Sequence, residues 1–267
     1  MTFLKRISFV LALAAAPLAG AAPALAQTAE QKGEDIAQRA QAKGKGFGDS
    51  LSSGQMILYT KGGSQSERRF NAKSLEGQGN NPGASLLVFE WPGDVRDTAL
   101  LTYSYDNKAD DQWLYLPSVG RVKRISSSAR SGSFMGSEFA YEDMTDQGAA
   151  EFNHKWVQDS GCPVGGGTCH VVDRTPKSRS GYAMQRVWFN AANLYVVQIQ
   201  YFDRAGKHVK TLQSSGQKQF QGKYWRPGKM RMVNHLTGKS TDLLWSGYKF
   251  RNGFSANDFS VQALKSR

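Results

Sequence analysis

The sequence predicts a mainly β fold built on an antiparallel sheet. Short runs of β-branched and aromatic residues follow one another along most of the chain, and clusters of Gly, Asn, Asp or Pro separate most of them. Helical stretches between these runs, which parallel strands would need as crossover connections, are missing. Several runs also alternate apolar and polar residues, which is typical of a sheet with one dry face and one wet face.

The first element is a predicted secretory signal peptide, residues 1–26. Two basic residues precede an apolar run at 7–18, and Ala24 and Ala26 are the small residues that signal peptidase recognises. The apolar run is shorter than the ~20 residues that a membrane-spanning helix needs. We therefore expect cleavage after Ala26 and a periplasmic location in a Gram-negative cell. Residues 27–267 are expected to form a single β domain, because no Pro/Ser-rich linker or internal repeat divides them.

The second element is a helix predicted at 28–43. Thr28 and Gln31 have the spacing of a capping box, in which each side chain accepts a hydrogen bond from the other residue's backbone N–H. Gly44 is placed to end the helix.

The strands follow in chain order. They are predicted at 55–59, 68–75, 85–91, 99–105, 112–116, 170–174, 182–189, 194–202, 207–213, 229–236 and 242–250. Trp113 and Tyr115 alternate with other residues until Pro117 and Gly120 mark a turn, which predicts an antiparallel hairpin at this point.

Several strands present an apolar face that we expect to line a cavity. A face that contains methionine is adaptable and suits flexible chains of varied shape. Ordinary core packing is the alternative, and the scarcity of helices to cover so much sheet favours the cavity. The predicted wall residues are Met56, Leu58, Leu101, Tyr103, Tyr195, Val197, Ile199, Met230 and Met232, with Tyr201 on the same face as Ile199.

A Gly- and Ser-rich segment from Ser131 to Met144 follows the hairpin. Phe134, Met135 and Phe139 lie within it, among residues that do not hold a packed element rigid. We expect this apolar trio to belong to a mobile lid over the cavity, because the sheet has more dry surface than its few helices can cover.

The run from Trp113 to Met144 resembles a known family. The patterns W-x-Y-x-P from Trp113, R-x-x-R-I from Arg121 and F-M-G-S-x-F-x-Y-E-D from Phe134 are similar to recurring blocks of the LolA-like outer membrane lipoprotein-sorting proteins. The resemblance implies an incomplete antiparallel β-barrel with a few short helices that form a lid, holding a lipid or acyl chains in its cavity. It also implies, as partners, an inner-membrane exporter of the resistance-nodulation-division type, an outer-membrane acceptor, or both.

The chain is strongly basic, with a formal net charge of +12. Such a charge suits nucleic acid, but outside the cytoplasm the common polyanions are lipid head groups and lipopolysaccharide, so we expect no nucleic-acid partner. Arg121, Lys123, Arg124 and Arg130 make the densest basic cluster, beside the expected lid. We expect the first three to dock on a membrane or a partner; a solvated strand face is the alternative.

The two cysteines, Cys162 and Cys169, enclose a short Gly-rich loop in a chain that enters an oxidising compartment. We expect a disulfide that staples this turn and contributes roughly 2.5 kcal/mol on the chain-entropy estimate. A zinc site with His154 and His170 would need irregular spacing, and the C-x-x-C-H pattern of haem attachment is missing. We expect neither a metal nor a cofactor.

Catalytic signatures are also missing from the sequence. It contains no G-x-S-x-G, no H-E-x-x-H, no Walker phosphate loop and no complete G-x-G-x-x-G. Adjacent carboxylates such as Asp110 and Asp111 would point apart on a strand, which disfavours a pair that shares a proton. We therefore expect no catalytic residues and no enzyme.

One hypothesis joins these observations: a monomeric periplasmic carrier that binds a lipid or a lipid-modified protein and passes it between membrane partners. Burying a methylene group is worth about 0.8 kcal/mol, so a long acyl chain needs a shield to cross water. One alternative is an accessory subunit of an export complex that carries no cargo, which a filled core would favour. Another is a hydrolase of envelope lipids or glycans, which would need clustered polar groups in a cleft.

Overall fold

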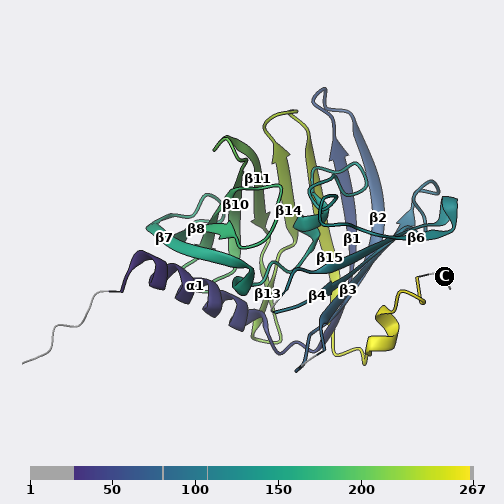
Figure 1. Ribbon diagram of the computed structural model, residues 1–267, viewed down its shortest axis with the longest axis horizontal. Coiled ribbons are helices and arrows are strands. Elements are labelled where there is room, and N and C mark those ends of the chain that lie inside the picture. The colour runs from purple at the N-terminus through teal and green to yellow at the C-terminus, as the bar shows by residue number, and fades with distance from the viewer. Residues whose placement is uncertain (1–26, 80, 107, 265–267) are drawn as a thin grey trace, which may run out of the picture.

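The computed structural model describes residues 27–79, 81–106 and 108–264 (Figure 1). The predicted signal peptide lies outside the described residues. The main sheet consists of β1 (Asp49–Tyr59), β2 (Gln65–Leu75), β3 (Gly83–Trp91), β4 (Ala99–Ser104), β5 (Asp111–Leu116), β6 (Arg121–Arg124), β7 (Phe152–Gly161), β8 (Thr168–Pro176), β9 (Met184–Asn190), β10 (Val196–Phe202), β11 (His208–Ser215), β14 (Lys229–Asn234) and β15 (Ser240–Phe250). A separate small hairpin pairs β12 (Lys218–Phe220) with β13 (Tyr224–Arg226).

The main sheet is antiparallel and curved, and it does not close into a barrel (Figure 1). Its order is β6-β5-β4-β3-β2-β1-β15-β14-β11-β10-β9-β8-β7, so β6 and β7 are its two ends. The two halves of the chain meet where β1 pairs with β15, with Met56 opposite Leu243. The prediction of a mainly β, incomplete antiparallel barrel is confirmed.

The helix α1 (Ala29–Gly44) packs against β7 along one rim of the sheet (Figure 1). Its capping box forms as predicted, since Thr28 Oγ1 accepts from Gln31 N at 3.1 Å and Gln31 Oε1 accepts from Thr28 N at 2.9 Å. At Gly33 an added Cβ would lie only 2.6 Å from Trp156 N, so the close approach to β7 requires glycine. Within the described ranges, no helix has the length and apolar character needed to cross a bilayer.

Apolar side chains cover both faces of the sheet. The larger cluster lies on the concave face and includes side chains from strands along nearly the whole sheet, together with Ile36 of α1. A smaller cluster lies on the convex face, where Phe259 and Leu264 of the C-terminal segment cover β3 and β4. There Tyr103 Oη donates a hydrogen bond to Phe259 O at 2.6 Å. One end of the sheet is therefore dry on both sides.

The disulfide between Cys162 and Cys169 is present, as predicted. It crosses the Gly-rich turn that joins β7 to β8, where Cys162 N also donates to Gly167 O at 2.9 Å. Among the side chains that the structure describes, no three of His, Cys, Asp or Glu come together in a group that could hold a metal ion.

Three features of the chain differ from the expectations. Strand β7 was not predicted, although it forms one end of the sheet. The small hairpin of β12 and β13 was not predicted either. The short helices are 3-10 turns: η1 (Pro117–Val119), η2 (Tyr141–Met144), η3 (Ala149–Glu151) and η4 (Ala256–Phe259).

Candidate functional site

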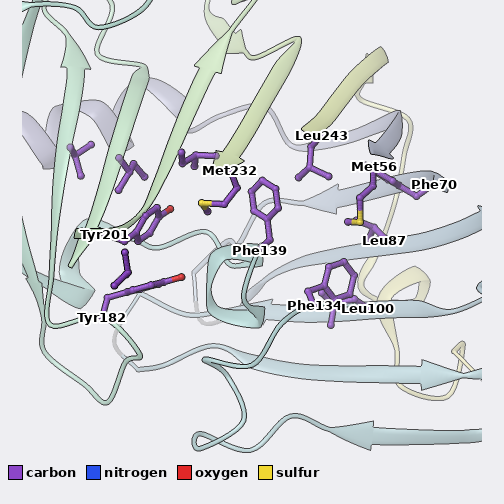
Figure 2. Packing of buried hydrophobic residues seen from close by; sticks show 14 of the residues in the cluster. Met56, Phe70, Leu87, Leu100, Phe134, Phe139, Tyr182, Tyr201, Met232 and Leu243 are labelled. Atoms are coloured by element: carbon purple, nitrogen blue, oxygen red, sulfur yellow. The ribbon is translucent and has the colours of Figure 1, made fainter. Parts of the chain in front are cut away.

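The segment expected to be a lid, residues 131–144, lies on the concave face and fills part of it; we call it the plug. Phe134 and Phe139 are 0% and 1% exposed and belong to the concave cluster. Phe134 stacks on Phe89 of β3 at 5.9 Å between ring centroids. Figure 2 shows Phe139 beside Met232 and Phe134 beside Leu100. The two phenylalanine rings therefore point into the sheet, and Met135 is partly buried against the same cluster.

A tight turn gives the plug its shape. Phe134 N donates to Phe139 O at 2.8 Å, and Ser137 Oγ donates to Phe134 O at 2.7 Å. Between them Met135 and Gly136 have φ angles of 52° and 74°, in the left-handed region that glycine adopts without strain. The Gly and Ser residues that predicted mobility thus also build a specific turn, which presents both phenylalanine rings to the sheet.

Polar contacts fix the plug to strands on both sides of the sheet centre. The guanidinium of Arg68 on β2 donates to Met135 O. Glu138 is held by three strands at once: its N donates to Thr241 Oγ1 at 3.0 Å, its carboxylate accepts from Asn234 Nδ2 at 2.7 Å, and its O accepts from Lys210 Nζ at 2.9 Å. The plug is therefore anchored by hydrogen bonds around its apolar tip.

A buried carboxylate anchors the far end of the plug. Asp143 accepts from Tyr182 Oη at 3.0 Å and from Ala140 N at 2.7 Å, and Lys210 Nζ lies 4.0 Å from it. Its other oxygen, Oδ1, is buried without a hydrogen-bond partner. Burial raises the pKa of Asp143 from 3.8 to about 6, against the opposing effect of Lys210. Burial also raises the pKa of Tyr182, so its hydroxyl remains a donor.

The raised pKa of Asp143 makes a pH-dependent contribution to stability. The folded state binds a proton on this group more tightly than the unfolded chain, so its contribution falls between about pH 4 and pH 6 and is constant above. Asp143→Asn removes this titration. We expect the unfolding free energy of wild type, relative to that of Asp143→Asn, to drop by on the order of 2 kcal/mol from pH 4 to pH 7. Urea denaturation of both proteins across this range measures the difference. Burial raises the pKa of Glu151 to about 7, but Glu151 titrates in both proteins, so its effect cancels when their unfolding free energies are subtracted. A difference in unfolding free energy that does not change with pH would contradict the prediction.

Most of the predicted cavity wall does lie together on the concave face. The concave cluster includes Met56, Leu58, Phe134, Met135, Phe139, Ile199, Tyr201, Met230 and Met232. Leu101 and Tyr103 do not join them, because they lie in the convex cluster beneath Phe259. Strand alternation alone does not reveal that the C-terminal segment covers that face, which is why both residues were predicted as cavity wall.

A β-bulge corrects the prediction for the start of β10. The register shifts between Val196 and Gln198, so that Val196 lies opposite Phe189 and shares its face. Val196 therefore packs on the concave cluster in place of the predicted Val197. Tyr195 instead contacts Trp225, with 5.4 Å between ring centroids.

The basic cluster of the predicted docking site divides between the two faces of β6. Arg121 and Lys123 are exposed and lie opposite Leu116 and Leu114, on the concave side of the sheet edge. Arg124 points to the convex side, where its guanidinium pairs with Asp111 and lies 6.0 Å from the centroid of the Trp113 ring. The predicted i, i+2 pair is thus together, whereas Arg124 has a carboxylate partner of its own.

The sequence did not predict the polar groups around the plug. Asp143, Tyr182 and Lys210 come from three distant segments, as do the arginines of an open pocket of about 490 Å³ that lies beside the plug. Of the pocket's three arginines, only Arg130 belongs to the predicted basic cluster. No short-range pattern marks contacts that the topology makes between loops.

Comparisons with known proteins place the chain among relatives of the same fold. A family model described only as an uncharacterized protein matches residues 83–266, and no curated protein matches the chain. A crystal structure from Vibrio parahaemolyticus, provisionally named an outer membrane lipoprotein-sorting protein domain, is 41% identical with a TM-score of 0.85, over 88% of this chain and 99% of that one.

Two further solved structures resemble the chain. A DUF1329 family protein from Desulfovibrio piger is 30% identical with a TM-score of 0.83, over 89% of this chain and 99% of that one. A LolA superfamily protein from Nitrosomonas europaea is 18% identical with a TM-score of 0.68, over 86% of this chain and 98% of that one. The last similarity is one of fold.

Proposed function

Because the chain belongs to the family of the outer membrane lipoprotein-sorting domain and has a LolA-like fold, we propose that it is a periplasmic carrier for a lipid or a lipid-modified protein. The apolar concave face is the proposed binding surface, and the plug is the part of the chain that gives way to cargo. No catalytic role is proposed for any residue.

The observation that carries this proposal is the burial of Phe134 and Phe139 on the concave face by a segment outside the sheet ladder. Any acyl chain that enters must displace these two rings. Burying a phenylalanine side chain is worth about 1.5 to 3 kcal/mol and a methylene about 0.8 kcal/mol, so about four to eight buried methylenes offset both rings. An acyl chain of ordinary length exceeds that number, and the exchange then favours cargo.

The polar anchors suit such an exchange. When the plug leaves, Lys210 loses its hydrogen bond to the Glu138 carbonyl and the Glu138 carboxylate loses its bond from Asn234. The ammonium and the carboxylate that are freed are charged groups that water solvates well. The net contribution of one hydrogen bond to stability is only about 0.5 to 1.5 kcal/mol. The polar anchors therefore define where the plug packs without preventing its release.

We also propose how cargo is passed on. The exposed Arg121 and Lys123 at the sheet edge, with Arg124, are suited to transient docking on anionic membranes or on a membrane partner, such as an inner-membrane exporter or an outer-membrane acceptor. The chain is proposed to act there as a monomer. Basic residues on an edge strand also discourage pairing with other sheets, which is the alternative role.

A transfer assay tests binding and docking separately. Delipidated protein is expected to bind a fluorescent fatty acid and to deliver it to anionic vesicles at low salt. The triple variant Arg121→Glu, Lys123→Glu and Arg124→Glu should bind the fatty acid as wild type does but transfer it several-fold more slowly, because exposed charge acts over a Debye length of ~8 Å at physiological salt. The defect should shrink as salt rises.

Two outcomes would count against the proposal. A protein that binds no fatty acid, and purifies from its native compartment with no lipid detectable by mass spectrometry, would be the accessory subunit without cargo. That alternative is favoured by one observation, that the plug already fills part of the concave face. If the triple variant transfers at the wild-type rate, these basic residues do not take part in docking, and their role is to keep the edge strand from pairing with other sheets.

A further inference from the structure

An open pocket of about 490 Å³ lies between three loops at one end of the plug. Arg130 and Ser131 come from the loop that begins the plug, Arg179 from the loop after β8, and Arg204 from the turn after β10. Serine hydroxyls and one carboxylate, that of Asp203, complete the polar lining.

The charge of this pocket is unbalanced. Asp203 is engaged by its own turn, since its carboxylate accepts from Ala205 N and Lys207 N at 2.9 Å each. Over the described part of the chain, none of the three arginines forms an ion pair, and Arg130 donates only to the carbonyl of Asp110. Three arginines without an ion-pair partner among the described residues therefore line one pocket together with serine hydroxyls, and guanidinium and hydroxyl donors are the groups that phosphate oxygens prefer.

The pocket is connected directly to the plug. Glu142 N donates to Arg130 O at 3.0 Å, and the Glu142 carboxylate accepts from Ser180 Oγ at 2.5 Å and from Gly181 N at 2.9 Å. The loops fit closely here, because a Cβ on Gly181 would lie 2.6 Å from Ser131 Cβ. Two of the three arginine-bearing loops thus hold the end of the plug, one residue from the buried Asp143.

We propose that this pocket binds the phosphate group of an amphiphile whose acyl chain takes the place of the plug. The inference rests on the proposed carrier function for the acyl chain and adds the chemistry of the head group. Arginines at the pocket recognise phosphate, and the chain passes from there to the concave face beside Tyr182, which follows Gly181 directly.

Two amphiphiles with the same chain test the head-group site: oleyl phosphate and oleyl alcohol. Wild type is expected to bind oleyl phosphate about tenfold or more tightly than oleyl alcohol. In Arg179→Gln with Arg204→Gln, that ratio should fall close to one, while the affinity for oleyl alcohol stays unchanged. Both side chains are exposed, so the fold should remain intact, and circular dichroism checks it.

The matched control is Arg96→Gln with Arg251→Gln, which removes the same charge from exposed positions outside the pocket. This variant should keep the wild-type ratio. Equal affinities for the two amphiphiles in wild type, or the same loss of ratio in the control, would overturn the pocket as the head-group site.

Inorganic phosphate alone separates this inference from the carrier function. Phosphate is expected to shift the amide resonances of Ser131 and Gly181 in wild type but not in the Arg179, Arg204 variant. If phosphate does so while neither amphiphile binds, the pocket is a site for free phosphate, and both the carrier function and the lipid head group are wrong. If the alcohol binds and phosphate causes no shift, the carrier function stands and the phosphate site is wrong.

Discussion

Replacing Phe139 by alanine is expected to lower the free energy of unfolding by about 3 to 5 kcal/mol and, at the same time, to strengthen fatty-acid binding by about tenfold. The side chain is 1% exposed and packs in the concave cluster, so its removal leaves a cavity that the rigid strands cannot fill. If the plug must leave before cargo enters, the same loss of packing lowers the free energy needed to open it. Urea denaturation and titration with a fluorescent fatty acid measure the two effects.

The matched control for this variant is Leu236→Ala. Leu236 is 56% exposed, so its truncation should change the unfolding free energy by no more than about 0.5 kcal/mol and leave binding unaltered. Lower stability of Phe139→Ala without tighter binding would mean that the ring is ordinary core and that cargo, if any, enters elsewhere.

Gly33→Ala is expected to destabilise the protein by about 3 kcal/mol, near the upper end of the range for overpacked sites. The new Cβ would lie 2.6 Å from Trp156 N and 2.8 Å from two backbone atoms of Lys155. These atoms belong to the ladder between β7 and β8 and cannot move as a flexible side chain does. Alanine normally favours a helix over glycine, so a loss of stability here isolates the steric effect. Thermal or urea unfolding followed by circular dichroism measures it.

Gly44→Ala provides the opposite case in the same helix. It is the last residue of α1, and a Cβ there would meet no atom within 4 Å. We expect no loss of stability from this substitution. Should Gly33→Ala be as stable as Gly44→Ala, α1 would have to sit farther from β7 than the structure places it.

The fold could largely be predicted from the sequence because strand alternation and turn residues are local signals. Strand β7 could not be predicted for a physical reason. Much of it is exposed or half-buried, and it contains no run of β-branched residues. Its buried residues, Phe152 and His154, are each followed by a polar residue. The helix α1 that packs against it supplies apolar contact that sequence alone does not reveal.

The candidate site was predictable only in part. The spacing of Phe134 and Phe139 identified an apolar segment outside the sheet, but Gly and Ser residues are equally compatible with a mobile loop and with the tight turn around Met135. Strand periodicity failed where an extra residue, Val197, shifts the register. It also could not reveal that Leu101 faces a C-terminal segment more than a hundred residues away.

The open edge of the sheet has a consequence for the size of its interior. In a closed barrel, strand number and stagger together set the radius. Here, in the described part of the chain, the ladder ends at β6 and β7, and no strand pairing joins those two ends. The width enclosed by the curved sheet can therefore change through the twist between neighbouring strands. In an open sheet of this kind, such a change of internal width breaks no hydrogen bond between paired strands.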